Sequence, residues 1–147
     1  MRRLAAELDV TPGALYRHLD NHEQLVAHMI DDVMQHVAMP NADDGADAWE
    51  RIRTHVRSLM SILDGYPGLD RLIARYGDSS PAARIRQKWL VEQLQSTGLR
   101  RADAIRAYGS LDMFWLGSRQ REQQTRTTFY FGLDRLLDGL REFARRA

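Results

Sequence analysis

Apolar residues recur every three or four positions along most of the chain, which is the spacing of one buried face of an α-helix. Downstream of Asn21 the apolar positions are Leu25, Val26, Met29, Ile30, Val33 and Val37. Downstream of Asp47 they are Trp49, Ile52, Val56, Leu59, Met60 and Leu63. No stretch of β-branched residues alternates with polar ones as a half-buried strand would. The pattern therefore predicts an all-α fold.

Residues that cap or break helices set the expected boundaries. Asn21 with Gln24, and Asp47 with Glu50, have the spacing of a capping box, which starts a helix. Glycine, proline and short polar residues mark the breaks. We expect loops at Met39–Ala46 and Gly65–Gly68, and further helices at Leu69–Tyr76, from Ser80-Pro81 to Gly98, at Ala102–Gln120 and at Thr127–Arg145.

The segment 1–22 has the pattern of a helix-turn-helix unit. A short helix, Arg2–Leu8, carries Leu4, Ala5 and Leu8 on one face, and a tight turn follows at Asp9–Val10. A turn of this length sets the next helix at a steep angle, so that its N-terminal end can enter a DNA major groove. The alternative is an ordinary capped corner between two helices.

The turn residues support the helix-turn-helix interpretation. Asp9 adopts the left-handed region more readily than most residues other than glycine. We expect Val10 to fill the space beneath the turn. Thr11 is a good N-cap, and Pro12 suits the first helical position, where no backbone N–H is needed.

The second helix leaves side chains suited to DNA on its outer face. Arg17 can make a bidentate contact to guanine or phosphate, and Tyr16 and His18 can donate to phosphate oxygens. Gly13 allows the backbone to approach the DNA closely, and Thr11 lies beside it at the start of the helix.

These residues carry a family resemblance. The segment RRLAAELDVTPGALYRHLDNHEQL resembles the DNA-binding segment of the tetracycline-repressor (TetR) family of bacterial transcription regulators. The closing run FYFGLDRLLDGL is similar to the last helix of many members, and Gly65-Tyr-Pro-Gly68 resembles a break in the middle of the same subfamily.

The resemblance implies two functional parts: a helix-turn-helix segment, 1–22, and a helical effector-binding and dimerisation domain, 23–147. The expected DNA-binding residues are Arg3, Thr11, Pro12, Gly13, Tyr16, Arg17, His18 and His22. Members carry another helix before the position of Met1, so the helix-turn-helix is expected to be truncated. His22 stands where the family usually has a lysine that meets phosphate, and it is largely neutral at pH 7.

The last helix has a heptad-like apolar seam with intervals of four and three residues. Its members are Phe129, Leu133, Leu136, Leu140 and Phe143, with Gly132 and Gly139 beside them. From the spacing alone, the seam faces either the core of its own chain or the same helix of a second copy. The resemblance favours a second copy, because family members dimerise through their last two long helices. A homodimer also suits a palindromic operator, with recognition helices ~34–36 Å apart.

The resemblance further implies a pocket for a small-molecule effector among the middle helices. Its expected lining residues are Met29, His55, Met60, Trp89, Asp112 and Trp115. Asp112 is a carboxylate on an apolar face, so it must be paired or exposed. It is suited to a cationic or hydroxylated effector, and the alternatives are an ion pair with an arginine or a place at a dimer interface. His55 is either a pocket residue or a hydrogen-bonded core residue.

Composition narrows the function classes. The 147 residues contain no cysteine, so disulfides and thiolate metal sites are excluded. No apolar run is long enough to span a membrane, and we expect a cytoplasmic protein without membrane contact. The net charge is only +1, and residues 1–22 hold equal numbers of arginines and acidic residues. A basic DNA-binding patch would therefore require that the fold gather the arginines on one face, or that missing residues supply further positive charge.

Catalytic and metal-binding signatures are absent from the sequence. We therefore expect no enzyme activity, no cofactor and no metal site. The leading hypothesis is a ligand-responsive DNA-binding regulator, a repressor that a small molecule releases from its operator. The alternative is a ligand-binding or heterodimerising protein that has lost DNA binding through the missing first helix. An enzyme on a helical scaffold is the third hypothesis.

Overall fold

The described residues form helices, and none of them belongs to a strand. The computed structural model describes residues 2–7, 9–11, 13–14, 21–41, 45–119 and 125–146. Its elements are α1 (Arg2–Glu7), α3 (His22–Met34), α4 (Ala48–Leu63), α5 (Leu69–Tyr76), the 3-10 turn η2 (Gly77–Ser79), α6 (Pro81–Ser96), α7 (Arg101–Arg119) and α8 (Arg126–Arg146). The predicted all-α fold is confirmed.

The helices begin where the capping residues predict. The Asn21 side chain accepts a hydrogen bond from the Gln24 backbone N–H at 2.8 Å, and Asp47 accepts one from the N–H of Glu50 at 2.9 Å. Ser80 caps α6 in the same way. Each cap satisfies a backbone donor that the first turn of a helix leaves without a partner.

The helix after Asn21 is shorter than its apolar pattern predicts. It ends at Met34, and Val37 lies in the turn that follows. Val37 is nevertheless buried, with 3% of its surface exposed. The prediction was wrong because a buried residue just after a helix can continue the apolar spacing without continuing the helix.

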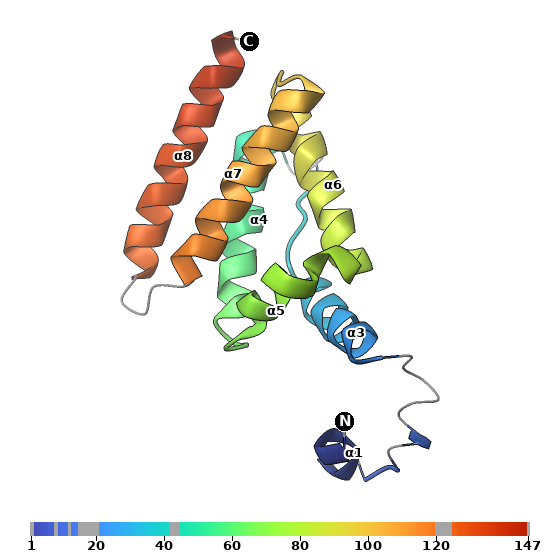
Figure 1. Cartoon of the computed structure of the whole chain (residues 1–147). Helices are drawn as coiled ribbons and strands as arrows, with labels where there is room; N and C mark the ends of the chain where they lie inside the picture. Colours follow the sequence, from blue (N-terminus) through green and yellow to red (C-terminus); the bar gives the residue numbers. More distant parts are fainter. Residues whose placement is uncertain are drawn as a thin grey trace.

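The core lies where α3, α4, α6 and α7 meet. Helix α6 packs against α3, α4 and α7, and α8 packs against α4 and α7. Figure 1 shows α1 and α3 at one end of the molecule and the C-terminus of α8 at the other. The most deeply buried large side chains of the core are Ile30, Ile52, Leu63, Leu94, Leu133 and Leu137.

Helix α8 turns a stripe at four-residue intervals toward the core of its own chain. Phe129, Leu133 and Leu137 are 2%, 0% and 2% exposed, and the Phe129 ring stacks on Phe114 of α7 with centroids 5.2 Å apart. Phe129 and Leu133 had been predicted at a dimer interface. Their side chains instead pack within the same chain, because α8 lies against α4 and α7.

The other predicted interface residues of α8 lie beside this stripe. A side chain added at Gly132 would meet the Phe114 ring at 2.8 Å, so the close approach at Gly132 is to α7 of the same chain. Leu136 and Leu140 are partly buried and pack on the core. Phe143 and Gly139 are exposed.

Candidate functional site

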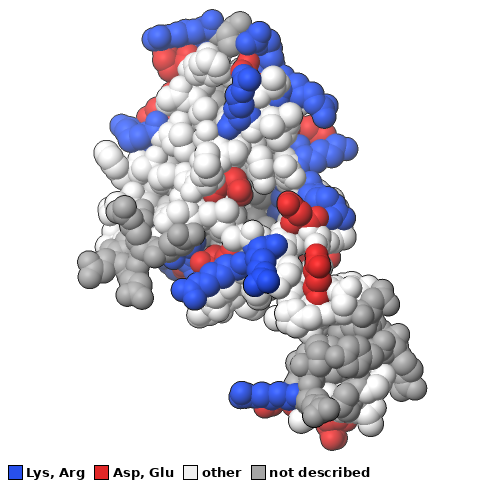
Figure 2. All heavy atoms as spheres, viewed as in Figure 1, with Lys and Arg blue, Asp and Glu red and all other residues white. Residues whose placement is uncertain are grey.

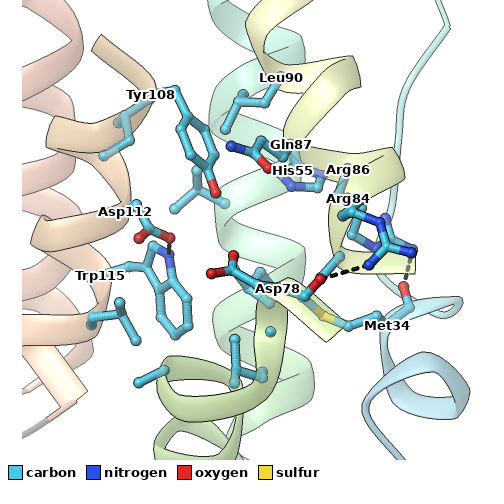
Figure 3. A pocket seen from close by; sticks show the side chains of 18 of the residues that line it. Met34, His55, Asp78, Arg84, Arg86, Gln87, Leu90, Tyr108, Asp112 and Trp115 are labelled. Atoms are coloured by element: carbon cyan, nitrogen blue, oxygen red, sulfur yellow. Dashed lines mark hydrogen bonds between the residues drawn. The ribbon is translucent and has the colours of Figure 1, made fainter. Parts of the chain in front are cut away.

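A cavity of about 260 Å³ lies among α4, α5, η2, α6 and α7. Hydrophobic side chains form much of its wall (Figure 3). They are Met34, Val56, Leu59, Ile73, Leu90, Leu111, Trp115 and Leu116. Polar side chains from five elements line the same space, and they are His55 from α4, Arg75 from α5, Asp78 from η2, Arg84, Arg86 and Gln87 from α6, and Tyr108 and Asp112 from α7. An apolar cavity with a few convergent polar groups is typical of a small-molecule site.

His55 lies on the α4 wall of the cavity and is 4% exposed. Its Nδ1 donates to the Ala38 carbonyl at 2.7 Å, because a carbonyl oxygen can only accept. Its ring lies against Trp89 with centroids 4.9 Å apart. Burial, reinforced by the positive charge of Arg86, lowers the pKa of His55 to about 4. His55 is therefore a neutral, hydrogen-bonded wall residue near pH 7.

Arg86 joins the cavity wall to the end of α3. It is 6% exposed, and its guanidinium donates to the Val37 carbonyl at 2.9 Å and to the Met34 carbonyl. These carbonyls lie at the C-terminal end of α3, where a helix favours a positive charge. Burial lowers the pKa of Arg86. Its Nε has no hydrogen-bond partner among the described residues.

Asp112 and Tyr108 form the polar side of the α7 wall. The Trp115 Nε1–H donates to the Asp112 carboxylate at 3.1 Å. Burial and the nearby charge of Asp78 raise the pKa of Asp112, against the effect of the Trp115 hydrogen bond. Burial, with the charges of Asp112 and Asp78, raises the pKa of Tyr108 to about 12. The Tyr108 hydroxyl is therefore protonated near pH 7.

The structure brings together three of the six residues predicted for an effector pocket. His55, Asp112 and Trp115 line the cavity. Trp89 does not line it and contacts the ring of His55. Met60 is buried in the core away from the lining, and Met29 is 48% exposed on α3.

Sequence reasoning missed Asp78, Arg86 and Gln87 as cavity residues. Arg86 and Gln87 lie on α6, for which no polar face was predicted. Asp78 belongs to a short 3-10 turn, and the sequence predicts only that an isolated aspartate in a turn faces solvent. No local signal in the sequence distinguishes these three residues from the other polar residues of the chain.

The turn that carries Asp78 also contacts α3. The Ser79 hydroxyl donates to Glu23 at 2.6 Å. The Ser80 hydroxyl and the Ala82 backbone N–H donate to the Asp31 carboxylate at 2.5 and 2.9 Å. The end of η2 and the start of α6 are therefore hydrogen bonded to α3.

The predicted helix-turn-helix segment is described in part. Asp9 has a φ of 52°, the left-handed conformation that its residue type favours. The Thr11 side chain accepts from the Ala14 backbone N–H at 3.2 Å, so Thr11 caps the following turn as predicted. Val10 was expected to fill the space beneath the turn. Its side chain is instead 42% exposed.

The predicted DNA-binding residues are divided between described and undescribed positions. Arg3, Thr11 and Gly13 are exposed. His22 is the first residue of α3, and its ring meets Tyr76 of α5 edge-on at 6.4 Å between centroids. Pro12, Tyr16, Arg17 and His18 lie outside the described residues. Basic and acidic side chains are mixed over the face seen in Figure 2 rather than gathered into one basic patch.

Solved structures with the same fold include regulators from two bacteria. BioQ, crystallised with its double-stranded DNA operator, is 31% identical with a TM-score of 0.81, over 96% of this chain and 84% of that chain. The chain belongs to the TetR family. Mycobacterium smegmatis BioQ is 29% identical with a TM-score of 0.82, over 96% of this chain and 85% of that chain.

A more distant TetR-family protein shares the fold. ActR from Streptomyces coelicolor, in complex with actinorhodin, is 21% identical with a TM-score of 0.81, over 98% of this chain and 87% of that chain. TetR-family proteins are transcriptional regulators and not enzymes. The sequence matches no family model, and the comparison with curated proteins finds no match.

None of the described helices is long and apolar enough to cross a membrane. No group of three or more His, Asp or Glu side chains in the described part is arranged to hold a metal ion.

Proposed function

We propose that this chain is a DNA-binding transcription regulator whose operator affinity changes when a small molecule occupies the cavity. The observation that carries the proposal is the position of η2. Asp78 lines the cavity, while the neighbouring Ser79 and Ser80 are hydrogen bonded to Glu23 and Asp31 of α3. Helix α3 directly follows the helix-turn-helix segment in the chain.

This arrangement supports a coupling between ligand and DNA. A ligand that binds one position of η2 more tightly than another shifts the population toward that position. Because η2 is fastened to α3, the shift changes where α3 holds the helix-turn-helix segment. By reciprocity, operator binding then changes ligand affinity by the same factor.

The molecules bound in two of the similar solved structures support a DNA partner and a small-molecule partner. BioQ was crystallised with its DNA operator and ActR with actinorhodin. For this chain we propose a double-stranded operator and a small-molecule effector of its own. We propose further that it is a repressor, released from the operator by the effector.

We also propose that the chain acts as a homodimer through α7 and α8. Four large apolar side chains of these helices are exposed: Ile105, Met113, Phe131 and Phe143, at 49%, 70%, 66% and 48%. Exposed apolar surface of this kind favours a protein partner. A two-fold dimer matches a palindromic operator with half-sites ~34–36 Å apart.

The experiment is a selection of bound duplexes from random-sequence DNA, followed by fluorescence anisotropy at low salt. We expect a palindromic consensus. Arg17→Ala should weaken binding because it removes a contact to guanine or phosphate. Lys88→Ala, an exposed change on α6, should leave binding unchanged.

Two outcomes would contradict parts of this proposal, the first the binding of DNA and the second the role as a repressor. A dimer that binds no duplex at low salt would be a ligand-binding or heterodimerising protein instead. A reporter gene placed behind the selected duplex should be expressed less when the chain is present. Higher expression would make the protein an activator rather than a repressor.

A further inference from the structure

One side of the cavity carries two carboxylates, those of Asp78 and Asp112, that form no ion pair with the described residues. Figure 3 shows the carboxylates of Asp78 and Asp112 and the hydroxyl of Tyr108 directed toward the same part of the cavity. Asp112 is half-buried and accepts a hydrogen bond from Trp115. Among the described residues, neither carboxylate belongs to an ion pair within 4.0 Å, although ion pairs are frequent elsewhere in this chain.

The basic residues of the cavity wall already have partners within the chain. Arg86 is held by the carbonyls at the end of α3. The Arg84 guanidinium donates to the backbone carbonyl of Asp78 at 2.6 Å. The Arg75 guanidinium lies over the Tyr76 ring at 5.2 Å. Each of these arginines thus has a contact within the chain, whereas neither carboxylate forms an ion pair with the described residues.

We propose that the cavity binds an organic cation, a protonated or quaternary amine on an apolar body, with its charged group between Asp112 and Asp78. This inference rests on the proposed function, because it names the ligand class of the same cavity. The amine would offset the repulsion between two carboxylates in a partly desolvated site. The apolar wall and the Trp115 ring would hold the body.

The electrostatics of Asp112 agree with this assignment. Burial raises the pKa of Asp112, and the charge of Asp78 adds to that effect. Burial thus disfavours the charged carboxylate, and a cation is the kind of ligand that reverses this.

The test uses three compounds that share one body and differ in their head group: phenylbutylammonium, phenylbutanol and phenylbutyrate. Their affinities are measured by titration calorimetry on the full chain without DNA. We expect the ammonium compound to bind at least about tenfold more tightly than the alcohol, and the carboxylate to bind most weakly.

Matched variants locate the effect. Asp112→Asn removes the charge and keeps an oxygen that can accept from Trp115, and it should abolish most of the preference for the ammonium over the alcohol. Asp78→Asn changes an exposed side chain and should reduce the same preference, which covers the case that Asp112→Asn fails to fold. Glu92→Gln, on the exposed side of α6 beside Lys88, should leave the preference intact.

Three outcomes would overturn the assignment: tighter binding of phenylbutyrate, a preference unchanged in both aspartate variants, or no binding of any of the three compounds. Because these titrations contain no DNA, they are independent of the proposed function. A chain that binds its selected duplex but shows no preference for the ammonium is still a regulator, and only the ligand class is wrong.

Discussion

The Asp31 carboxylate of α3 accepts a hydrogen bond from the Ser80 hydroxyl at the start of α6, with 2.5 Å between the two oxygens. Ser80 is fully buried, and its hydroxyl also caps α6 by accepting from the Ala83 N–H at 3.0 Å. The same carboxylate accepts from the Ala82 N–H. One aspartate thus fastens the middle of α3 to the corner that η2 and α6 form beside the cavity.

Replacing Asp31 with alanine should lower the free energy of unfolding by about 1–3 kcal/mol, because the buried Ser80 hydroxyl and the Ala82 N–H lose their acceptor. Urea denaturation measures the change. Asp32→Ala is the matched control, since Asp32 is an exposed neighbour whose carboxylate accepts from Gln35 of the same helix end. Equal unfolding free energies for the two variants would show that the Asp31 contact contributes nothing.

His55 should make the protein less stable in mild acid. Burial lowers its pKa to about 4 in the folded protein, whereas the unfolded chain has the ordinary value of about 6.5. Between these values the unfolded state binds the extra proton, so stability is full above about pH 6.5 and falls by up to about 3 kcal/mol toward pH 4.

The pH prediction is checked by urea denaturation of the native chain and of His55→Gln between pH 7 and pH 4. The loss of stability should be smaller in His55→Gln, because glutamine does not titrate. His28→Gln, at an exposed position on α3, should keep the native pH dependence. Parallel curves for the native chain and His55→Gln would contradict the prediction.

Arg86→Met should destabilise the fold by about 2–4 kcal/mol, because the carbonyls of Met34 and Val37 lose a charged, buried donor. Lys88→Met tests the loss of a charge on the exposed side of the same helix and should change stability by less than about 0.5 kcal/mol. Thermal unfolding of both variants measures the difference. A melting temperature for Arg86→Met equal to that of Lys88→Met would refute the role of Arg86.

Phe131→Glu should convert the proposed dimer into a folded monomer, because it places a charge at an apolar side chain that is 66% exposed on α8. Sedimentation velocity reports the oligomeric state, and circular dichroism reports the helix content. Ile85→Glu makes the same kind of change at a 59% exposed position on α6 and should remain dimeric. A dimeric Phe131→Glu protein would place the interface elsewhere.

Local chemistry is the reason that the helix boundaries were predictable. Asn21, Asp47 and Ser80 each cap a helix through a hydrogen bond to a residue three positions further on. The left-handed turn at Asp9 and the cap at Thr11 follow from residue type in the same way. Each of these contacts joins residues a few positions apart in the chain, so nearby residue types are enough to predict it.

The apolar residues of α8 show where local patterns stop being sufficient. The spacing of Phe129, Leu133 and Leu136 left two partners open, the core of the same chain and a second copy. In the structure Phe129, Leu133 and Leu137 face the core, because α8 rotates to pack on α4 and α7. Helical spacing identifies an apolar stripe but does not say which neighbour covers it.

The helices, their caps and the likeness to TetR-family regulators could be inferred from the sequence, because these depend on neighbouring residues and on motifs of contiguous positions. The packing of the helices was needed to show that Asp78, Arg86 and Asp112 surround one cavity and that Asp31 meets Ser80 across 49 positions of the chain. Such contacts depend on how whole helices pack, and packing is fixed by the joint burial of many side chains rather than by any local run of residues.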